Sequence, residues 1–170
     1  KMIKVLFICH GNICRSPMCH FYFQSLVDQH HLESYIQVDS AATSTEEIGN
    51  PVHPGTRRKL AEAGIRCDGK KARQMTRKDC DEYDYLIGMD SWNIRNMQRI
   101  AGAKNQEKIY KLLEFAETEN VNDKNRGKQS VRDVADPWYT GDFEQTWKDT
   151  VEGCQGLLQY ILEHDFGKTD

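Results

Sequence analysis

Cys9 and Arg15 are separated by five residues and follow directly on the first apolar run of the sequence. A segment that leads from a buried strand into a helix can turn several backbone N–H groups toward one anion, and the helix N-terminus favours negative charge there. The planar guanidinium of arginine matches two phosphate oxygens. The same positive surroundings stabilise a thiolate, which is the nucleophilic form of cysteine. The pattern therefore predicts a loop that binds a phosphate group and a thiol, Cys9, that attacks it.

Several residues of this segment have side chains suited to shaping such a loop. We expect Gly11 to adopt a positive φ, Asn12 to bond to backbone carbonyl groups, and Ser16 both to donate its hydroxyl to the thiolate and to cap the following helix. Besides Cys9 and Arg15, the predicted phosphate-binding loop contains His10, Gly11, Asn12, Ile13, Cys14 and Ser16. Cys9 or Arg15 alone would indicate only a buried thiol or a surface charge, but strand, loop, Ser-Pro and helix together favour phosphate chemistry.

A candidate proton donor lies far along the chain, in the stretch VADPWY. A phenolic leaving group with a pKa of about 10 needs a proton at neutral pH, and Asp136 is the candidate to give it. An Asp-Pro turn alone would carry only a surface carboxylate, but beside the Cys9 loop the catalytic interpretation is favoured. Trp138 and Tyr139 are expected to form one wall of a cleft deep enough for a phenyl ring. Asp133 lacks this context and is expected to be solvated.

Composition limits the other classes of function. Lysine and arginine number 23 against 26 aspartate and glutamate, so the net charge of −3 predicts no nucleic-acid partner and no membrane surface. No apolar run has membrane-spanning length. The sequence shows no signal peptide, and its six cysteines form no C-x-x-C pair, which predicts a cytoplasmic protein with reduced thiols and without zinc. We expect a monomer with no metal or other cofactor.

Apolar runs and helical spacing alternate along the chain. Buried strands are predicted at residues 2–9, 35–40, 85–89 and 108–113. Helices are predicted at residues 17–32, 54–63, 91–100 and 143–164, with Ser91 capping the third. This alternation predicts an α/β protein whose parallel sheet is covered on both faces. A single domain over residues 1–170 is expected, with a mobile surface loop at residues 117–130.

The stretch VLFICHGNICRSP resembles the signature C-x-G-N-x-C-R-S-P of the low molecular weight protein tyrosine phosphatases. Similar segments follow in the family's order, namely SAAT (40–43), KARQMT (71–76), YDYLIGMD (83–90) and DPWYTGD (136–142). The resemblance implies a three-layer, Rossmann-like fold with a four-stranded parallel twisted sheet flanked by helices on both faces. It implies metal-independent hydrolysis of phosphotyrosine in proteins or peptides, and of aryl phosphates, through a phosphocysteine intermediate. Cys9 would be the nucleophile, Arg15 the phosphate clamp and Asp136 the general acid.

The substrate cleft is where this sequence departs most from the family pattern. An aliphatic residue at Ile13 goes with phosphotyrosine in the family, whereas a threonine there resembles the protein-arginine phosphatases; packing beneath the loop is an equally compatible role for Ile13. Glu46 and Glu47 stand where many relatives carry an aromatic residue, and they would form the wall opposite Trp138 and Tyr139. They would either favour basic residues near the phosphotyrosine or simply be solvated.

Two further points concern the cysteines and a lysine. Cys14 shares the tight loop with Cys9, so it is predicted to trap oxidised Cys9 as a disulfide, or else only to fit the loop. Lys70 replaces a histidine of many relatives that supports the loop. An arsenate reductase would need further redox cysteines, for which Cys67 and Cys80 are the candidates, but they lack the usual close spacing. A non-catalytic phosphate-binding or redox-sensing module is the other alternative.

Overall fold

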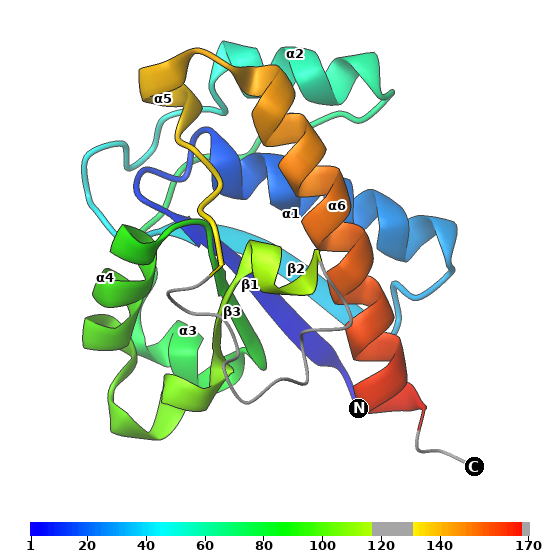
Figure 1. Cartoon of the computed structure of the whole chain (residues 1–170). Coiled ribbons are helices and arrows are strands. Elements are labelled where there is room, and N and C mark those ends of the chain that lie inside the picture. Colours follow the sequence, from blue (N-terminus) through cyan, green and yellow to red (C-terminus); the bar gives the residue numbers. More distant parts are fainter. Residues whose placement is uncertain (117–130, 168–170) are drawn as a thin grey trace.

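The computed structural model describes residues 1–116 and 131–167 of the chain (Figure 1). At the centre of this part lies a four-stranded sheet whose neighbouring strands are all parallel, in the order β2-β1-β3-β4. The strands are β1 (Ile3–Cys9), β2 (Ile36–Ala42), β3 (Tyr85–Gly88) and β4 (Ile109–Lys111). The order places β1 between β2 and β3. Its last residue, Cys9, therefore lies at the carboxyl edge, where open parallel sheets bind their ligands.

Helices cover both faces of the sheet, which confirms the predicted three layers (Figure 1). The α-helices are α1 (Arg15–Gln29), α2 (Pro54–Glu62), α3 (Arg77–Glu82), α4 (Ser91–Ala101), α5 (Pro137–Thr140) and α6 (Phe143–Ile161). Two 3-10 turns flank β4, η1 (Ala103–Lys108) and η2 (Leu112–Phe115), and a π-helical turn, η4 (Leu162–Phe166), continues α6. Among the described helices, none has the length and hydropathy needed to span a bilayer.

The side chains of β1 alternate between two hydrophobic layers. Val5 and Phe7 pack with residues of α1 and α6, whereas Leu6 and Ile8 pack with residues of α3 and α4. All four are fully buried. Because both faces of the strand are covered, its sequence is continuously apolar rather than alternating, which is typical of a central parallel strand. This packing fixes the end of β1, and with it the start of the loop that follows.

The start of α1 differs from the prediction. The helix begins at Arg15, and Cys14 occupies the N-cap position without a side-chain capping bond. Ser16 therefore lies inside the first turn and does not cap the helix. The reason is local: the hydroxyl of Ser16 is engaged by the Cys9 thiol and the Asn12 amide, as described below.

The structure differs from the sequence expectations at three further points, and one more expectation concerns residues that the structure does not describe. The strand predicted at 108–113 is shorter, because the chain turns into η2 at Leu112. The cap of α4 is Asp90, whose carboxylate accepts the Asn93 N–H, and not Ser91. The helices α3 and α5 were not predicted, because six and four residues are too few to show a helical hydrophobic period. The loop predicted at residues 117–130 lies outside the described residues.

Candidate active site

The sulfur of Cys9 takes part in three hydrogen bonds with residues that follow it in the chain. The backbone N–H groups of Asn12 and Ser16 approach its Sγ at 3.3 and 3.4 Å, and the Ser16 hydroxyl lies 3.1 Å away. Asn12 donates its side-chain N–H to Ser16 Oγ at 2.8 Å, which holds the hydroxyl beside the sulfur. Cys9 is only 3% exposed. Two backbone N–H groups and one hydroxyl therefore converge on one buried sulfur.

The backbone of the loop reverses at Asn12 rather than at the expected glycine. Asn12 has a φ of 62°, whereas Gly11 is not among the residues with positive φ. Asparagine tolerates this conformation better than other side chains do. Its Oδ1 accepts the Arg73 backbone N–H at 3.2 Å, so the side chain bonds to an N–H group and not to carbonyl groups. At position 11 the space is limited instead: a Cβ there would lie 3.2 Å from Cγ of Glu47, which would have to shift slightly.

Arg15 lies almost completely buried beneath the pocket, with 2% of its surface exposed. Its Nη1 donates to Asp90 Oδ2 at 2.7 Å and to the Val134 carbonyl at 2.9 Å, and its Nη2 lies 3.3 Å from Asp136 Oδ2. Burial alone would lower the pKa of Arg15, but Cys9, Asp90 and Asp136 outweigh it and raise the pKa. The guanidinium is therefore permanently charged and held in one orientation. The sequence did not indicate Asp90 as its partner, although Asp90 follows the buried strand next to β1.

The two carboxylate oxygens of Asp136 make different contacts. Its Oδ1 accepts the Trp138 backbone N–H at 3.0 Å and so caps α5, which leaves Oδ2 to face Arg15. The short helix α5 in turn places Trp138 and Tyr139 at the surface, 59% and 84% exposed. The indole of Trp138 packs edge-to-face against the ring of His53, with centroids 5.9 Å apart. An aromatic wall therefore rises directly beside the carboxylate.

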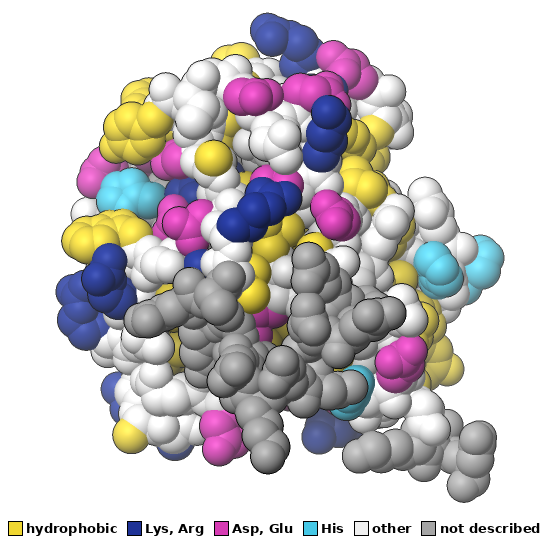
Figure 2. All heavy atoms as spheres, viewed as in Figure 1, with side chains coloured by type: hydrophobic (Ala, Val, Ile, Leu, Met, Phe, Trp, Pro, Cys, Tyr) yellow, Lys and Arg dark blue, Asp and Glu magenta, His cyan; other side chains and the backbone are white. Residues whose placement is uncertain are grey.

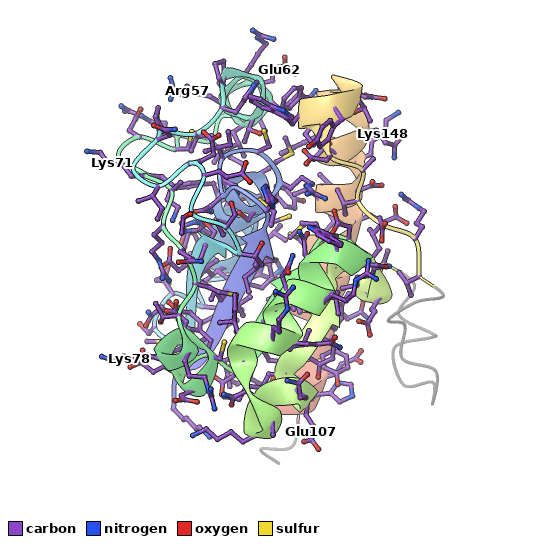
Figure 3. All side chains as sticks on the ribbon, turned by 90° about the vertical axis from the view of Figure 1, so that its left-hand side faces the viewer. Arg57, Glu62, Lys71, Lys78, Glu107 and Lys148 are labelled. Atoms are coloured by element: carbon purple, nitrogen blue, oxygen red, sulfur yellow. The ribbon has the colours of Figure 1, made fainter. Side chains whose placement is uncertain are left out.

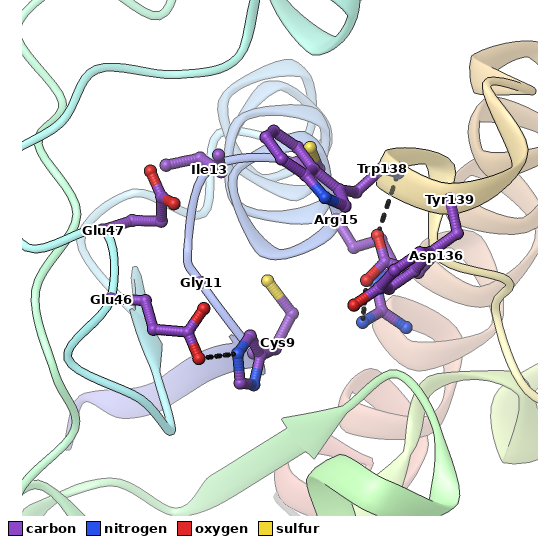
Figure 4. Close-up of a pocket in the computed structure, with 11 residues that line it drawn as sticks. Cys9, Gly11, Ile13, Arg15, Glu46, Glu47, Asp136, Trp138 and Tyr139 are labelled. Atoms are coloured by element: carbon purple, nitrogen blue, oxygen red, sulfur yellow. Dashed lines mark hydrogen bonds and ion pairs between the residues drawn. The ribbon is translucent and has the colours of Figure 1, made fainter.

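One pocket unites these elements (Figure 4). Its lining comprises Cys9, His10, Gly11, Ile13, Cys14, Arg15, Glu46, Glu47, Asp136, Trp138 and Tyr139. In Figure 4, Glu46 and Glu47 lie on one side of Cys9, and Asp136, Trp138 and Tyr139 on the other. The structure thus brings together every predicted cleft residue, and Asn12 and Ser16 lie buried behind the loop that they shape.

A network of charged residues supports the loop from behind. The Arg73 guanidinium donates to Asp39 at 2.9 Å and to Asp79 at 2.8 Å, and its backbone N–H holds Asn12. Asp79 also closes a capping box at the start of α3. Arg73 therefore connects the loop to β2 and α3 through hydrogen bonds. The sequence analysis did not identify this role, because the contact to Asn12 is made by a backbone N–H that carries no sequence signal.

Lys70 joins the same network one step further from the loop. Its Nζ donates to the Ser40 carbonyl at 2.9 Å and lies 3.5 Å from Asp39. The imidazole of His20 bonds to the Ser40 hydroxyl at 2.9 Å. Burial lowers the pKa of His20 to about 4, with Lys70 and Arg73 adding to the effect and Asp39 opposing it. His20 is therefore neutral in the folded protein at neutral pH.

The lowered pKa of His20 predicts acid sensitivity in a defined range. Between the ordinary histidine pKa of 6.5 and about 4, the unfolded chain binds a proton at this site and the folded chain does not. We therefore expect His20 to remove up to about 3 kcal/mol from the free energy of unfolding as the pH falls through this range. Urea unfolding of the wild type and of His20→Asn across this pH range measures the change in the free energy of unfolding. Parallel pH curves for the two proteins would contradict the prediction.

The remaining candidate residues, Cys67, Cys80 and Asp133, lie outside the pocket. Cys67 and Cys80 are buried in two different hydrophobic clusters, and neither lines the pocket, which removes the support for an arsenate reductase. Asp133 is not merely solvated: it lies 2.7 Å from Nζ of the buried Lys111 and accepts the Ser91 N–H. Asp133 is exposed as predicted, but the sequence does not show its ion pair, which the buried ammonium group of Lys111 requires. Within residues 1–116 and 131–167, no group of His, Cys, Asp or Glu side chains could hold a metal ion.

Comparison with known proteins gives one consistent result. The model of the low molecular weight phosphotyrosine protein phosphatase family matches residues 4–166. The low molecular weight protein-tyrosine-phosphatase YfkJ of Bacillus subtilis is 42% identical over 160 residues, which cover 94% of this chain and 96% of the relative. PtpA of Staphylococcus epidermidis is 35% identical over 162 residues, which cover 95% of this chain and 96% of PtpA.

Solved structures agree. The crystal structure of YfkJ superimposes with a TM-score of 0.85 over 96% of each chain. The low molecular weight protein tyrosine phosphatase SP-PTP of Streptococcus pyogenes, 36% identical, superimposes with a TM-score of 0.80 over 99% of each chain. The chain therefore belongs to the low molecular weight protein tyrosine phosphatase family.

Proposed function

We propose that Cys9, Arg15 and Asp136 carry out the phosphatase reaction of this family member on phosphotyrosine. In the first step the Cys9 thiolate attacks phosphorus, an S–P bond forms and the bond from phosphorus to the phenolic oxygen breaks. The protonated Asp136 gives its proton to the departing oxygen, so that tyrosine leaves as a neutral phenol. The observation that carries this proposal is the convergence of two backbone N–H groups and the Ser16 hydroxyl on the Cys9 sulfur, in the same pocket as Arg15 and Asp136.

Arg15 supplies the charge stabilisation. The transferring phosphoryl group spreads negative charge over its three outer oxygens, and a fixed guanidinium stabilises that charge without reorganising. Asp90 and the Val134 carbonyl hold Nη1, which orients Nη2 toward the pocket. The backbone N–H groups of the loop add further donors. No step requires a metal ion.

The second step regenerates the enzyme. Asp136, now a carboxylate, takes a proton from a water molecule whose oxygen attacks phosphorus. The S–P bond breaks, inorganic phosphate leaves and Cys9 returns to the thiolate, while Asp136 is protonated for the next cycle. One carboxylate thus serves as acid and then as base, so the two steps share one geometry.

The walls of the pocket support phosphotyrosine as the substrate. Ile13 on one side and Trp138 and Tyr139 on the other leave a slot between apolar surfaces above Cys9 (Figure 4). A flat phenyl ring can fill such a slot, with its phosphate reaching the buried sulfur. The side chain of phosphoserine is shorter and has no ring to fill the slot. His53 supports this arrangement, because it donates its backbone N–H to the Ile13 carbonyl and packs on Trp138.

A stopped-flow experiment tests the proposal. Reduced enzyme is mixed, in EDTA, with excess chromogenic aryl phosphate. We expect a burst of phenol whose amplitude equals the enzyme concentration, followed by slower turnover, because phosphocysteine accumulates. Full activity in EDTA is expected because Arg15 and the backbone N–H groups of the loop supply the charge stabilisation without a metal ion. Turnover that EDTA abolishes and Mg²⁺ restores, or the absence of any turnover, would refute the mechanism.

We also propose that Cys14 protects Cys9 from irreversible oxidation. Burial, and to a smaller extent the neighbouring Cys9 and Asp136, raise the pKa of Cys14 to about 12. Cys14 therefore remains a protonated thiol while Cys9 reacts with peroxide. The Cys14 thiol then condenses with the Cys9 sulfenic acid, forming a disulfide and releasing water. We expect Cys14→Ser to retain turnover but to lose the recovery of activity by dithiothreitol after peroxide treatment. Equal recovery in both proteins would disprove the protective role.

A further inference from the structure

We propose that Glu46 and Glu47 make this phosphatase select phosphotyrosine that has a lysine or arginine within two residues of it. The inference rests on the proposed function of the pocket and specifies its substrate class. The two glutamates belong to residues 43–50, which connect β2 to the region before α2 and form the wall opposite Trp138 and Tyr139 (Figure 4).

The acidic wall is fixed to the phosphate-binding loop. The backbone N–H of Thr43 donates to the Cys9 carbonyl at 2.9 Å, and that of Ser44 donates to the His10 carbonyl at 3.1 Å. The Ser44 hydroxyl donates to the same carbonyl at 2.8 Å. These bonds continue the pairing of β2 with β1 beyond the end of the sheet. The glutamates that follow are thereby positioned relative to the nucleophile before any substrate arrives.

The far end of the wall is held as well. The Gly49 N–H donates to the Ala72 carbonyl and the Ala72 N–H to the Asn50 carbonyl, at 2.8 and 2.9 Å. The Asn50 side chain donates to Glu47 Oε1 at 2.8 Å. The stem of Glu47 lies over Gly11, as the 3.2 Å distance to a Cβ at that position shows. Glu47 is therefore directed along the rim of the pocket rather than away into solvent.

The partners of the glutamates leave their negative charge at the rim. The Glu46 carboxylate meets Nε2 of His10 at 2.8 Å, and among the described residues that of Glu47 meets only the neutral amide of Asn50. Each contact uses one oxygen, whereas a carboxylate offers about four acceptor positions. His10 offsets the charge of Glu46 when it is protonated. Glu47 is consequently expected to contribute more than Glu46.

The charges deeper in the pocket do not cancel the acidic rim. Among the described residues that line it, Arg15 is the only one with a guanidinium or ammonium group, and Arg15 is paired with Asp90 and Asp136 at the bottom. The opposite wall is aromatic and uncharged. At the left-hand edge of the molecule in Figure 2, below the position of α5 in Figure 1, acidic side chains lie close to hydrophobic ones, with a histidine and basic side chains nearby.

A substrate peptide has to cross this rim when its phosphotyrosine enters the pocket. Lysine or arginine next to the phosphotyrosine meets the carboxylates, whereas aspartate or glutamate is repelled by them. Exposed charge pairs of this kind change an equilibrium by about two- to fivefold each, and salt weakens them. With two glutamates, we expect kcat/KM for a peptide with a neighbouring lysine to exceed that for the matched glutamate peptide by about tenfold at low ionic strength.

The test compares phosphotyrosine peptides that differ at one position, with lysine, alanine or glutamate one or two residues before or after the phosphotyrosine. The measured quantity is the ratio of kcat/KM for lysine over glutamate within each enzyme, so changes in overall activity cancel. Glu47→Gln is expected to lower the wild-type ratio by about fivefold, Glu46→Gln by about twofold, and the double variant to bring it near one. Raising the salt concentration to about 1 M should do the same.

Glu107→Gln serves as the matched control. It removes one negative charge from η1, at the end of the molecule away from α2 and α5 (Figure 3), and should leave the ratio unchanged. A wild-type ratio near one at all four positions, or a ratio that survives in the double variant, would overturn the proposal. A phenol burst with aryl phosphate in the same preparation shows that the chemistry is intact. Failure of the selectivity is thereby distinguished from failure of the proposed function.

Discussion

Replacing Cys9 by serine is expected to lower kcat for aryl phosphate hydrolysis by at least about 10⁴-fold and to remove the burst. The serine hydroxyl is not ionised at neutral pH, and the donors that stabilise a thiolate cannot make it a comparable nucleophile. The loop geometry should survive, because the Asn12 and Ser16 N–H groups and the Ser16 hydroxyl can donate to an oxygen as they do to sulfur. The loss therefore reports on chemistry and not on folding.

Phosphate binding provides the internal check on this variant. Arg15 and the loop amides remain in place in Cys9→Ser, so inorganic phosphate should still protect the protein against thermal unfolding. Cys67→Ser is the matched control, because Cys67 is a buried thiol in a different hydrophobic cluster and should retain the burst. Residual turnover of Cys9→Ser within about tenfold of wild type would mean that another group attacks phosphorus.

The nucleophile loop could be predicted from the sequence because all its determinants are contiguous. The apolar run of β1 ends at Cys9, the helix follows within six residues, and Arg15 lies at the junction. The same holds for Asp136, whose neighbours Pro137 and Trp138 mark a turn with aromatic surface. In each case the chemistry follows from residue types that are adjacent along the chain.

What the sequence does not predict is contact between distant segments. Asp90 holds Arg15 across 75 residues of chain, and Arg73 holds Asn12 across 61. Both contacts depend on the register of the sheet, which brings the ends of β1, β2 and β3 to one edge. Asp90 has the one usable signal, since it follows directly on a buried strand. The positive φ at Asn12 was misplaced at Gly11 because glycine is the usual residue for that conformation.

Replacing Asp136 by asparagine is expected to lower kcat for phenyl phosphate and phosphotyrosine by about 10²- to 10³-fold. The amide cannot protonate the departing phenolate, which is a poor leaving group because its conjugate acid has a pKa of about 10. An aryl phosphate with a much more acidic phenol needs little protonation, so the first step should then be affected far less. A steep dependence of the rate on leaving-group acidity, shallow in wild type, is the signature of a lost general acid.

Asp136→Asn is expected to remove the proton donor while keeping the contact that holds α5 in place. Asparagine caps helices as well as aspartate does, so its Oδ1 can still accept the Trp138 N–H and hold α5 and the aromatic wall in place. Asp142→Asn is the matched control, because Asp142 caps α6 through the Gln145 N–H and does not line the pocket. It should show the wild-type leaving-group dependence. Because the proposed mechanism also uses Asp136 as the base in the second step, its asparagine variant should hydrolyse phosphocysteine slowly and accumulate it even with the most activated substrate. Equal leaving-group dependence in Asp136→Asn and Asp142→Asn would assign the proton to another group.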